Sequence, residues 1–212
     1  MRNILLPASP DAPAPTRLAW LPGVYNGAQD FLTAGFAHAV GRRQIALDLD
    51  FVDLEMTHWG DRTALQQLRS DIVLPARAAG TAIWLGGISL GGFFALDYAA
   101  CYPGELDGLC LLAPYLGNRM LIAEIAAAGG IADWQPGALA VTDAERRVWR
   151  YIKFSSGMAP LYLGFGLDDR FAAAHESLAA ALPPDSVHRI AGGHEWHTWT
   201  RLWENFLDWR FT

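Results

Sequence analysis

The stretch "WLGGISLGGFFAL", residues 84–96, decides the fold of this chain. Bulky apolar residues stand at both of its ends, and four glycines surround the single hydroxyl of Ser89. The first apolar run is typical of a buried strand and the second of a buried helix. A G-x-S-x-G sequence at such a corner, here residues 87–91, predicts a nucleophile elbow, in which the serine backbone is strained and its flanking positions must be nearly bare. The serine hydroxyl would then lie at a helix N-terminus, where free N–H groups favour developing negative charge.

A glycine-rich turn that packs a helix against a strand, as in nucleotide-binding folds, is the alternative interpretation of the same stretch. A dinucleotide-binding loop requires G-x-G-x-x-G, and a phosphate-binding P-loop requires G-K followed by Ser or Thr. The loop at residues 86–92 has neither pattern. The elbow is therefore favoured, provided that the chain also supplies a base and an acid.

Short apolar runs alternate with segments of helical spacing along most of the chain, which predicts an α/β fold with a mostly parallel sheet and helices on both faces. The expected strands are residues 16–23, 43–54, 81–88, 106–115, 159–166 and 186–192, and the expected helices are 28–40, 63–80, 90–103, 169–182 and 197–209. The second of these helices runs into Pro75, so its end is left open. Residues 114–160 hold two helical segments, 120–130 and 142–154, without a strand between them. We interpret them as a small helical insertion within one domain that spans residues 1–212.

Composition narrows the classes of function. The 212 residues are 52% hydrophobic, which suits one domain with a large core. The net charge is −6 and there is no basic run, so neither a nucleic acid nor an anionic membrane is an expected partner. No apolar segment is long enough for a membrane span or a signal peptide, and we expect a cytoplasmic protein. The proline-rich residues 7–15 are expected to be extended or mobile.

A serine nucleophile needs a base, and the base needs a carboxylate that holds its tautomer. Elbow folds supply them in the order serine, acid, histidine. Asp168 and Asp169 follow the predicted strand at residues 159–166, at the sheet edge where ligand sites of parallel sheets form. One carboxylate could face the histidine while the other caps the next helix, although helix capping could also explain both.

His194 is the favoured base, because it follows two glycines after the last predicted strand and precedes the closing helix. It would thus lie on a loop at the same sheet edge. His197, three residues further on at the helix start, is its rival. The other histidines are assigned elsewhere: His188 to packing of the last strand, His38 and His175 to helix surfaces, and His58 to a loop that could line a pocket.

An oxyanion hole needs two backbone N–H donors. Leu90, the residue after the serine, should supply one of them. The other should come from "LPGVYNG", residues 21–27, where Gly23 allows a close approach and Val24 or Tyr25 follows. An ordinary Pro-Gly turn would explain the same residues.

These motifs together resemble the α/β-hydrolase superfamily, over a match that runs from about Arg17 to the C-terminus. The segments "LPGVYNG", "GISLGG", "GLDDRF" and "GGHEWHTW" carry the resemblance, and the last two are similar to the acid and histidine loops of small bacterial esterases and acyl hydrolases. In those families the acid commonly falls three residues after a glycine, which favours Asp169 over Asp168. There are two departures. Pro22 stands where a histidine is usual, and the short chain either lacks opening strands or builds one from "RNILLPA".

The resemblance implies hydrolysis of a small-molecule ester or thioester through an acyl-enzyme, with Ser89 as nucleophile, His194 as base, Asp169 as its orienting acid, Leu90 and Val24 as oxyanion donors, and neither a metal nor a cofactor. A lyase or perhydrolase with the same triad, or a non-catalytic binding protein of the same fold, are the alternatives. The expected pocket walls, for each of which core packing is the other interpretation, are Tyr25, Phe93, Tyr115, Trp134 and Trp196. The arginines of the insertion could recognise an anionic substrate or form a solvated helix face: Arg119, Arg146, Arg147 and Arg150.

Overall fold

The computed structural model of the chain describes residues 1–54, 62–138, 140, 142–154 and 158–212. Within these residues seven strands form one sheet, in the order β1-β3-β2-β4-β5-β6-β7. β1 pairs antiparallel with β3 at the edge, and every other neighbouring pair is parallel. The strands are β1 (Arg2–Leu6), β2 (Thr16–Leu21), β3 (Leu47–Asp53), β4 (Ala82–Ile88), β5 (Gly108–Leu112), β6 (Leu161–Gly166) and β7 (Val187–Ile190).

Helices cover both faces of this sheet, as predicted. One face carries α1 (Ala28–Thr33), α2 (Phe36–Arg43) and α9 (Trp196–Phe211), and the other carries α3 (Arg62–Leu68), α4 (Leu74–Ala78), α5 (Leu90–Cys101) and α8 (Ala172–Ala179). The described residues also contain a 3-10 turn at Pro184–Ser186. Every residue of β5 and β6 is buried, which explains why these strands have apolar runs without alternation.

Aromatic rings fill the core between the sheet and α9. The Trp20 ring meets Phe36 at 5.0 Å and Trp203 at 5.2 Å, both edge to face, and Phe36 stacks on Trp203 at 5.3 Å. Such pairs stabilise beyond the area they bury. They anchor α9 on the sheet, and the loop that precedes α9 carries His194.

Two helix boundaries differ from the sequence-based expectation. The single helix expected over residues 28–40 is two helices, because Gly35 adopts a φ of 84° and turns the chain between α1 and α2. The helix that ran into Pro75 continues past it as α4, after a π-helical turn at Arg69–Val73. A proline removes one helical hydrogen bond and crowds the carbonyl four residues earlier, which here is that of Asp71 inside the wider turn.

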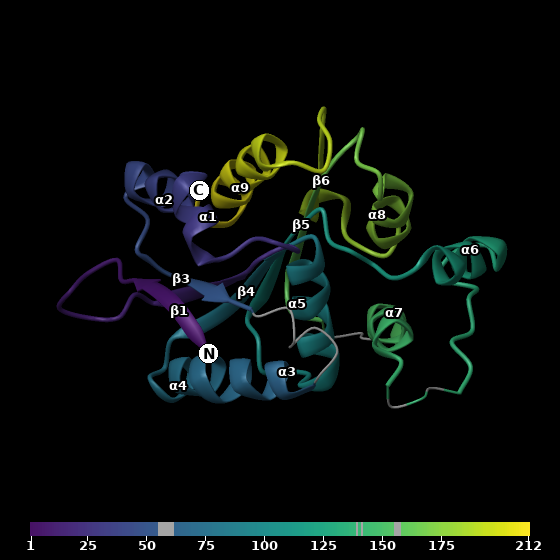
Figure 1. Cartoon of the computed structure of the whole chain (residues 1–212), viewed down its shortest axis with the longest axis horizontal. Helices are drawn as coiled ribbons and strands as arrows, with labels where there is room; N and C mark the ends of the chain where they lie inside the picture. Colours follow the sequence, from purple (N-terminus) through teal and green to yellow (C-terminus); the bar gives the residue numbers. More distant parts are fainter. Residues whose placement is uncertain (55–61, 139, 141, 155–157) are drawn as a thin grey trace.

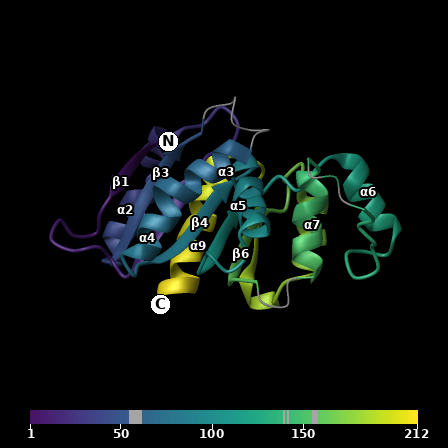
Figure 2. The same cartoon turned by 90° about the horizontal axis from the view of Figure 1, so that it is seen from below.

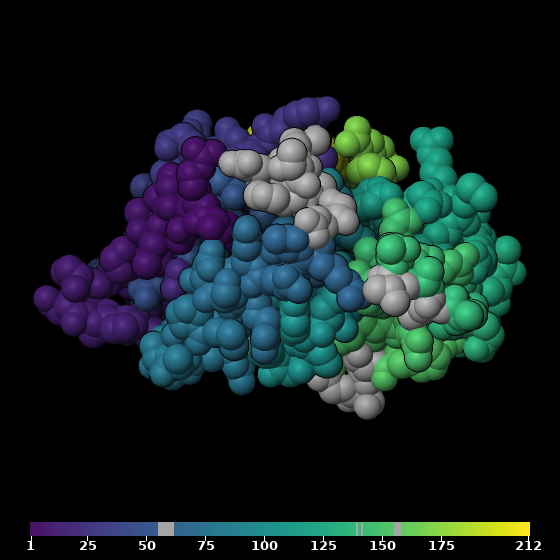
Figure 3. Space-filling model, turned by 60° about the horizontal axis from the view of Figure 1, so that its bottom comes forward, coloured from purple at the N-terminus to yellow at the C-terminus, as the bar shows by residue number. Residues whose placement is uncertain are grey.

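The N-terminal segment forms the edge strand β1, so the segment "RNILLPA" builds a strand of the sheet, which was one of the two expectations. The proline-rich loop that follows is tied at both ends by the Asp48 carboxylate, which accepts the backbone N–H groups of Ala8 (2.8 Å) and Ala14 (3.1 Å). Between these ties the loop projects from one end of the molecule, opposite the helices of the insertion (Figures 1 and 3).

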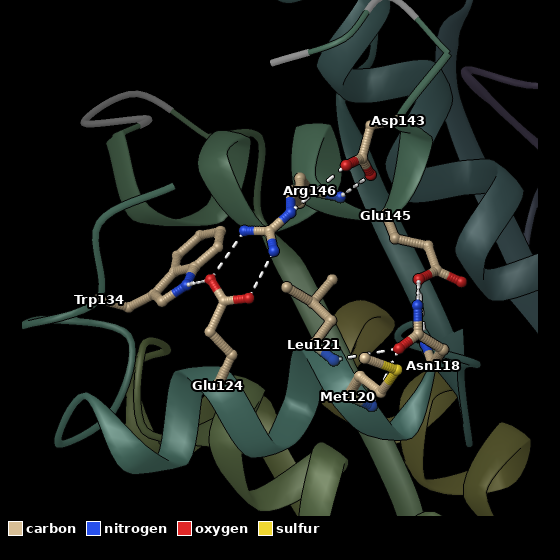
Figure 4. Close-up of polar contacts among 8 residues, drawn as sticks. All are labelled: Asn118, Met120, Leu121, Glu124, Trp134, Asp143, Glu145 and Arg146. Atoms are coloured by element: carbon tan, nitrogen blue, oxygen red, sulfur yellow. Dashed lines mark hydrogen bonds and ion pairs between the residues drawn. The ribbon is translucent and has the colours of Figure 1, made fainter. Parts of the chain in front are cut away.

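The insertion contains α6 (Arg119–Ala127) and α7 (Ala144–Phe154), and Figure 2 shows both lying beyond α5 at the side of the sheet. The Arg147 guanidinium joins α7 to α5 through both carboxylate oxygens of Asp97, at 2.8 Å and 3.0 Å. Within the insertion, the Arg146 guanidinium binds Glu124 across α6 and α7 (Figure 4). These ion pairs hold both helices against the rest of the fold.

A search of the described helices finds none with the length and apolar character that a membrane crossing requires.

Candidate active site

Ser89 occupies the corner between β4 and α5, with a φ of 52° and a ψ of −117°. A positive φ is strained for a residue with a side chain, and it persists only where the surroundings impose it. Two backbone hydrogen bonds do so here. The Ser89 N–H donates to the Leu112 carbonyl at 3.1 Å, and the Ser89 carbonyl accepts the N–H of Tyr115 at 2.8 Å. The residues that follow β5 therefore hold the elbow in shape.

Two glycines make the corner sterically possible. A Cβ on Gly87 would lie 2.3 Å from the carbonyl carbon of Gly91, where β4 and α5 cross. A Cβ on Gly91 would lie 2.1 Å from the Leu21 carbonyl oxygen, at the end of β2. Both contacts are with backbone atoms that cannot rotate away. The G-x-S-x-G pattern thus reflects the close approach of three segments around Ser89.

The structure brings Ser89, His194 and Asp169 together in one hydrogen-bonded line. The His194 Nε2 lies 2.9 Å from the Ser89 Oγ, and its Nδ1 lies 2.7 Å from the Asp169 Oδ2. The three side chains come from loops that follow β4, β6 and β7, all at the C-terminal edge of the parallel strands. Ser89 is 8% exposed and Asp169 is 5% exposed, so the line is largely shielded from water.

The surroundings of Asp169 favour its charged form. Burial raises the pKa of this carboxyl, but the hydrogen bonds from the His194 ring and from the Phe171 N–H (2.8 Å) outweigh burial and lower the pKa below its usual value. A carboxylate can only accept, so the His194 Nδ1 must carry the hydrogen. The Nε2 is then left with a lone pair, which can accept the proton of the Ser89 hydroxyl.

Asp168 has a different place from its neighbour. Its side chain is exposed, its N–H donates to the Gly192 carbonyl at 3.0 Å, and its carboxylate accepts the Gly192 N–H at 3.3 Å. These contacts clamp the loop that carries Asp169 to the loop that carries His194. Asp168 therefore does not touch the imidazole.

Among the described residues, no other histidine forms a hydrogen bond with the Ser89 hydroxyl. His197 and His38 are exposed on α9 and α2, and the His188 ring stacks on Tyr162 at 4.7 Å, where β7 packs. His58 lies outside the described residues. His175 corrects an expectation, because it is 0% exposed although we expected it on a helix surface. The surrounding alanines of α8 are small enough to let the imidazole pack inward.

Two backbone N–H groups are available beside the serine. Leu90 is the first residue of α5, where N–H groups have no helical acceptor, and Gly23 lies so near the elbow that its Cβ would be 3.5 Å from the Ser89 Cβ. Within the part of the chain that the structure describes, neither Leu90 N–H nor Val24 N–H has an acceptor. Tyr25 follows with a φ of 64°, and its side chain is 90% exposed.

Two aromatic rings that sequence reasoning missed hold the imidazole of His194. Phe171 meets it edge to face at 5.2 Å, and Trp199 does so at 5.1 Å. Phe171 stands two residues after Asp169, and Trp199 lies on the first turns of α9. Their positions in the sequence, close to Asp169 and His194, were the only available indication of this contact. The direction of each side chain depends on tertiary packing.

The predicted pocket residues divide into two groups. Tyr115 lies between Phe93 (5.7 Å) and Phe171 (6.1 Å), so these rings form a continuous aromatic row that reaches His194. Trp134 is only 1% exposed, and its Nε1–H donates to Glu124 at 2.8 Å (Figure 4). It packs in the core of the insertion, which was the alternative interpretation for this residue.

Trp196 packs away from the aromatic row. Its ring meets Phe31 at 5.6 Å and Trp199 at 5.3 Å, in the core on the α9 face, and its contact with the imidazole is indirect, through Trp199. Core packing was the alternative for this residue and describes it better than a pocket wall.

The arginines of the insertion are only partly free to meet a ligand. Arg146 is engaged with Glu124, and Arg147 with Asp97. Arg119 and Arg150 are exposed at the start of α6 and on α7.

Comparisons with known proteins identify structural neighbours over nearly the whole chain. No protein-family model and no curated protein matches the sequence. A fluorophosphonate-binding serine hydrolase F of Staphylococcus aureus, in a substrate-bound structure, is 10% identical with a TM-score of 0.67, and the match covers 95% of this chain and 86% of that one. An S-formylglutathione hydrolase from the same species is 12% identical with a TM-score of 0.61, over 95% and 84% of the two chains. A monoacylglycerol lipase of Paleococcus ferrophilus is 14% identical with a TM-score of 0.61, over 97% of each chain. At these identities the likeness shows the fold and no more.

Proposed function

From the α/β-hydrolase fold of this chain, we propose that it is a serine hydrolase that cleaves a carboxylic ester or thioester through an acyl-enzyme. One observation carries the proposal. His194 lies within hydrogen-bond distance of both the Ser89 hydroxyl (2.9 Å) and a buried carboxylate of Asp169 (2.7 Å). A nucleophile, a base and an orienting acid are the minimal machinery for acyl transfer.

In the first half of the reaction, Ser89 Oγ attacks the acyl carbonyl while the His194 Nε2 takes the hydroxyl proton. Asp169 stabilises the imidazolium that forms and keeps its ring in place. The negative charge that develops on the carbonyl oxygen would be met by the N–H groups of Leu90 and Val24, which have no acceptor among the described residues. Collapse of the tetrahedral intermediate expels an alkoxide or thiolate, which His194 protonates as it leaves.

In the second half, water attacks the acyl group on Ser89, and His194 acts again as base. The acid product departs and the serine hydroxyl is restored. Every proton moves between His194 and oxygen or sulfur atoms of the reactants, so the described side chains account for the cycle without a metal or cofactor.

The chemistry around the triad favours an uncharged acyl or aryl group. Phe171 contacts the imidazole and continues into the row of Tyr115 and Phe93, and none of these three rings carries a charge. The neighbours' printed names include both an ester hydrolase, the monoacylglycerol lipase, and a thioester hydrolase, the S-formylglutathione hydrolase. Both leaving groups therefore belong in the first substrate panel.

The test is covalent labelling by a fluorophosphonate, read by intact mass. Wild type should gain one adduct, while Ser89→Ala and His194→Ala should gain none. His197→Ala is the matched control, because it removes the rival histidine without touching the line to Ser89. Absence of an adduct on folded wild type, or labelling of Ser89→Ala, would reject the proposal. An active wild type would then be assayed on paired ester and thioester substrates.

A further inference from the structure

His175 is a fully buried imidazole that the proposed chemistry does not use. Its Nε2 lies 2.9 Å from the carbonyl oxygen of Pro114. A carbonyl can only accept, so this nitrogen carries the hydrogen, and the Nδ1 is left without a partner within the described residues. The ring rests against Phe165 at 5.0 Å. An apolar side chain could fill this space, so the presence of a single buried donor calls for an explanation.

The ring is expected to stay neutral. Burial lowers the pKa of His175, and it outweighs the opposing effects of the nearby Asp169 carboxylate and of the hydrogen bond to Pro114. Because the ring stays neutral, it keeps one donor aimed at the Pro114 carbonyl and places no positive charge near Asp169.

Pro114 lies in the segment that supports the elbow. The next residue, Tyr115, donates its N–H to the Ser89 carbonyl at 2.8 Å. The Pro114 ring also lies against the first turn of α5, where a Cβ on Gly92 would be 2.8 Å from the Pro114 Cβ. Pro114 is buried and has no N–H, so its carbonyl is its single backbone hydrogen-bonding group.

The other end of His175 is tied to the acid loop. Its backbone N–H donates to the Phe171 carbonyl at 3.1 Å, and the Phe171 N–H donates to the Asp169 carboxylate at 2.8 Å. The hydrogen bonds thus run without a break from the acid, through Phe171 and His175, to the peptide beside the serine. A buried chain of hydrogen bonds of this kind fixes the spacing of the two segments that it joins.

We infer that His175 is a positioning residue, whose Nε2–H bond to Pro114 sets the register between the elbow and the loop of Asp169. The inference rests on the proposed function, because the geometry that it maintains is that of the serine, the base and the acid. His175 itself touches neither the substrate nor the reacting atoms.

Two substitutions separate this role from simple filling of the core. His175→Gln keeps an amide N–H near the position of Nε2, whereas His175→Met fills a similar volume without a donor. His188→Gln is the control. His188 is partly buried and, like His175, has one ring nitrogen without a partner among the described residues, but it packs on Tyr162 near the start of β7. The site residues follow the other ends of the strands.

The readout is kcat and KM on an ester that wild type hydrolyses, together with the fluorophosphonate labelling rate, on protein shown to be folded by circular dichroism. His175→Met should lower kcat by about 10- to 100-fold with little change in KM, as expected for a misplacement of up to about 1 Å. His175→Gln should recover most of that loss, and His188→Gln should match wild type. A folded His175→Met with wild-type kcat, or a His175→Gln as slow as His175→Met, would overturn the inference.

A second measurement does not depend on any variant. Long-range proton–nitrogen NMR of wild type reports the tautomer of each histidine, and His175 should be neutral with its hydrogen on Nε2 at neutral pH. A hydrogen on Nδ1 would overturn the inference even if His175→Met fails to fold. Wild type that does not label with the fluorophosphonate would reject the proposed function and the inference together, whereas labelled wild type with unaffected variants would reject the inference alone.

Discussion

Gly91→Ala tests the elbow geometry most directly. The added Cβ would lie 2.1 Å from the Leu21 carbonyl oxygen and 2.6 Å from that of Pro22. Non-bonded heavy atoms settle at about 3.5 Å, so the backbone at the end of β2 would have to retreat by roughly 1 Å or more. That backbone continues into Gly23, which lies next to Ser89, and then into Val24.

The size of the effect follows from this shift. A misplacement of about 1 Å near reacting groups can cost about 100-fold in rate, and the loss of one oxyanion donor costs about 100- to 1000-fold. Steric strain of this kind lowers the free energy of unfolding by about 1–3 kcal/mol. Gly91→Ala should therefore stay folded, lose at least about 100-fold in kcat, and change KM much less.

Gly41→Ala is the matched control. Gly41 lies within α2, is exposed, and has nothing within 4 Å of a built Cβ. Alanine should raise the free energy of unfolding by about 0.5–1 kcal/mol there and leave kcat unchanged. Both variants would be compared by urea unfolding and by hydrolysis of an ester at saturating concentration. If Gly91→Ala keeps wild-type kcat, the loop after β2 does not supply an oxyanion donor.

Two further predictions concern the acid loop. Asp169→Asn should lower kcat by about 10,000-fold, because the amide favours the wrong imidazole tautomer. Asp168→Asn should lower kcat much less, since it only loosens the contact with Gly192. The opposite ranking in steady-state kinetics would transfer the acid role to Asp168. Because the pKa of Asp169 is lowered in the folded state, its contribution to the free energy of unfolding is complete above the unfolded-state pKa and is lost as the pH falls through the folded-state value. The difference in that free energy between wild type and Asp169→Asn should thus shrink as the pH falls below about 4, the usual pKa of an unfolded-state Asp, and a difference that grows would contradict the assignment.

The sheet could be predicted because its central strands are buried on both faces. In β5 and β6 burial leaves uninterrupted apolar runs, and the alternating helices then determine a parallel arrangement. The helix boundaries could not be predicted equally well. A glycine inside a helical pattern can be tolerated or can turn the chain, as Gly35 does, and Pro75 can end a helix or be accommodated by a wider turn. Tertiary packing chooses between these outcomes.

The site likewise has features that the sequence predicts and features that it does not. Ser89, Asp169 and His194 each follow a strand at one edge of the sheet, so topology alone predicts that they lie near one another. The inward direction of Phe171 or His175 has no comparable signal, because the alanines around His175 give α8 no clear apolar stripe. For Trp134 the sequence left a pocket wall and core packing both open, and only the structure shows the Arg146 guanidinium, paired with Glu124, lying over its ring.

Tyr115 connects the elbow at Ser89, which backbone hydrogen bonds hold in shape, with the row of aromatic side chains. Its N–H holds the Ser89 carbonyl, while its hydroxyl donates to Glu145 of α7 at 2.7 Å. Burial and this hydrogen bond raise the pKa of Tyr115, so the phenol remains a donor. Backbone contacts constrain the elbow whichever side chains surround it, and we propose that substrate choice depends on the aromatic row. The Tyr115 hydroxyl bonds this row to α7, so we expect a change in how α7 packs to reach the aromatic row before it disturbs the hydrogen bonds among Ser89, His194 and Asp169.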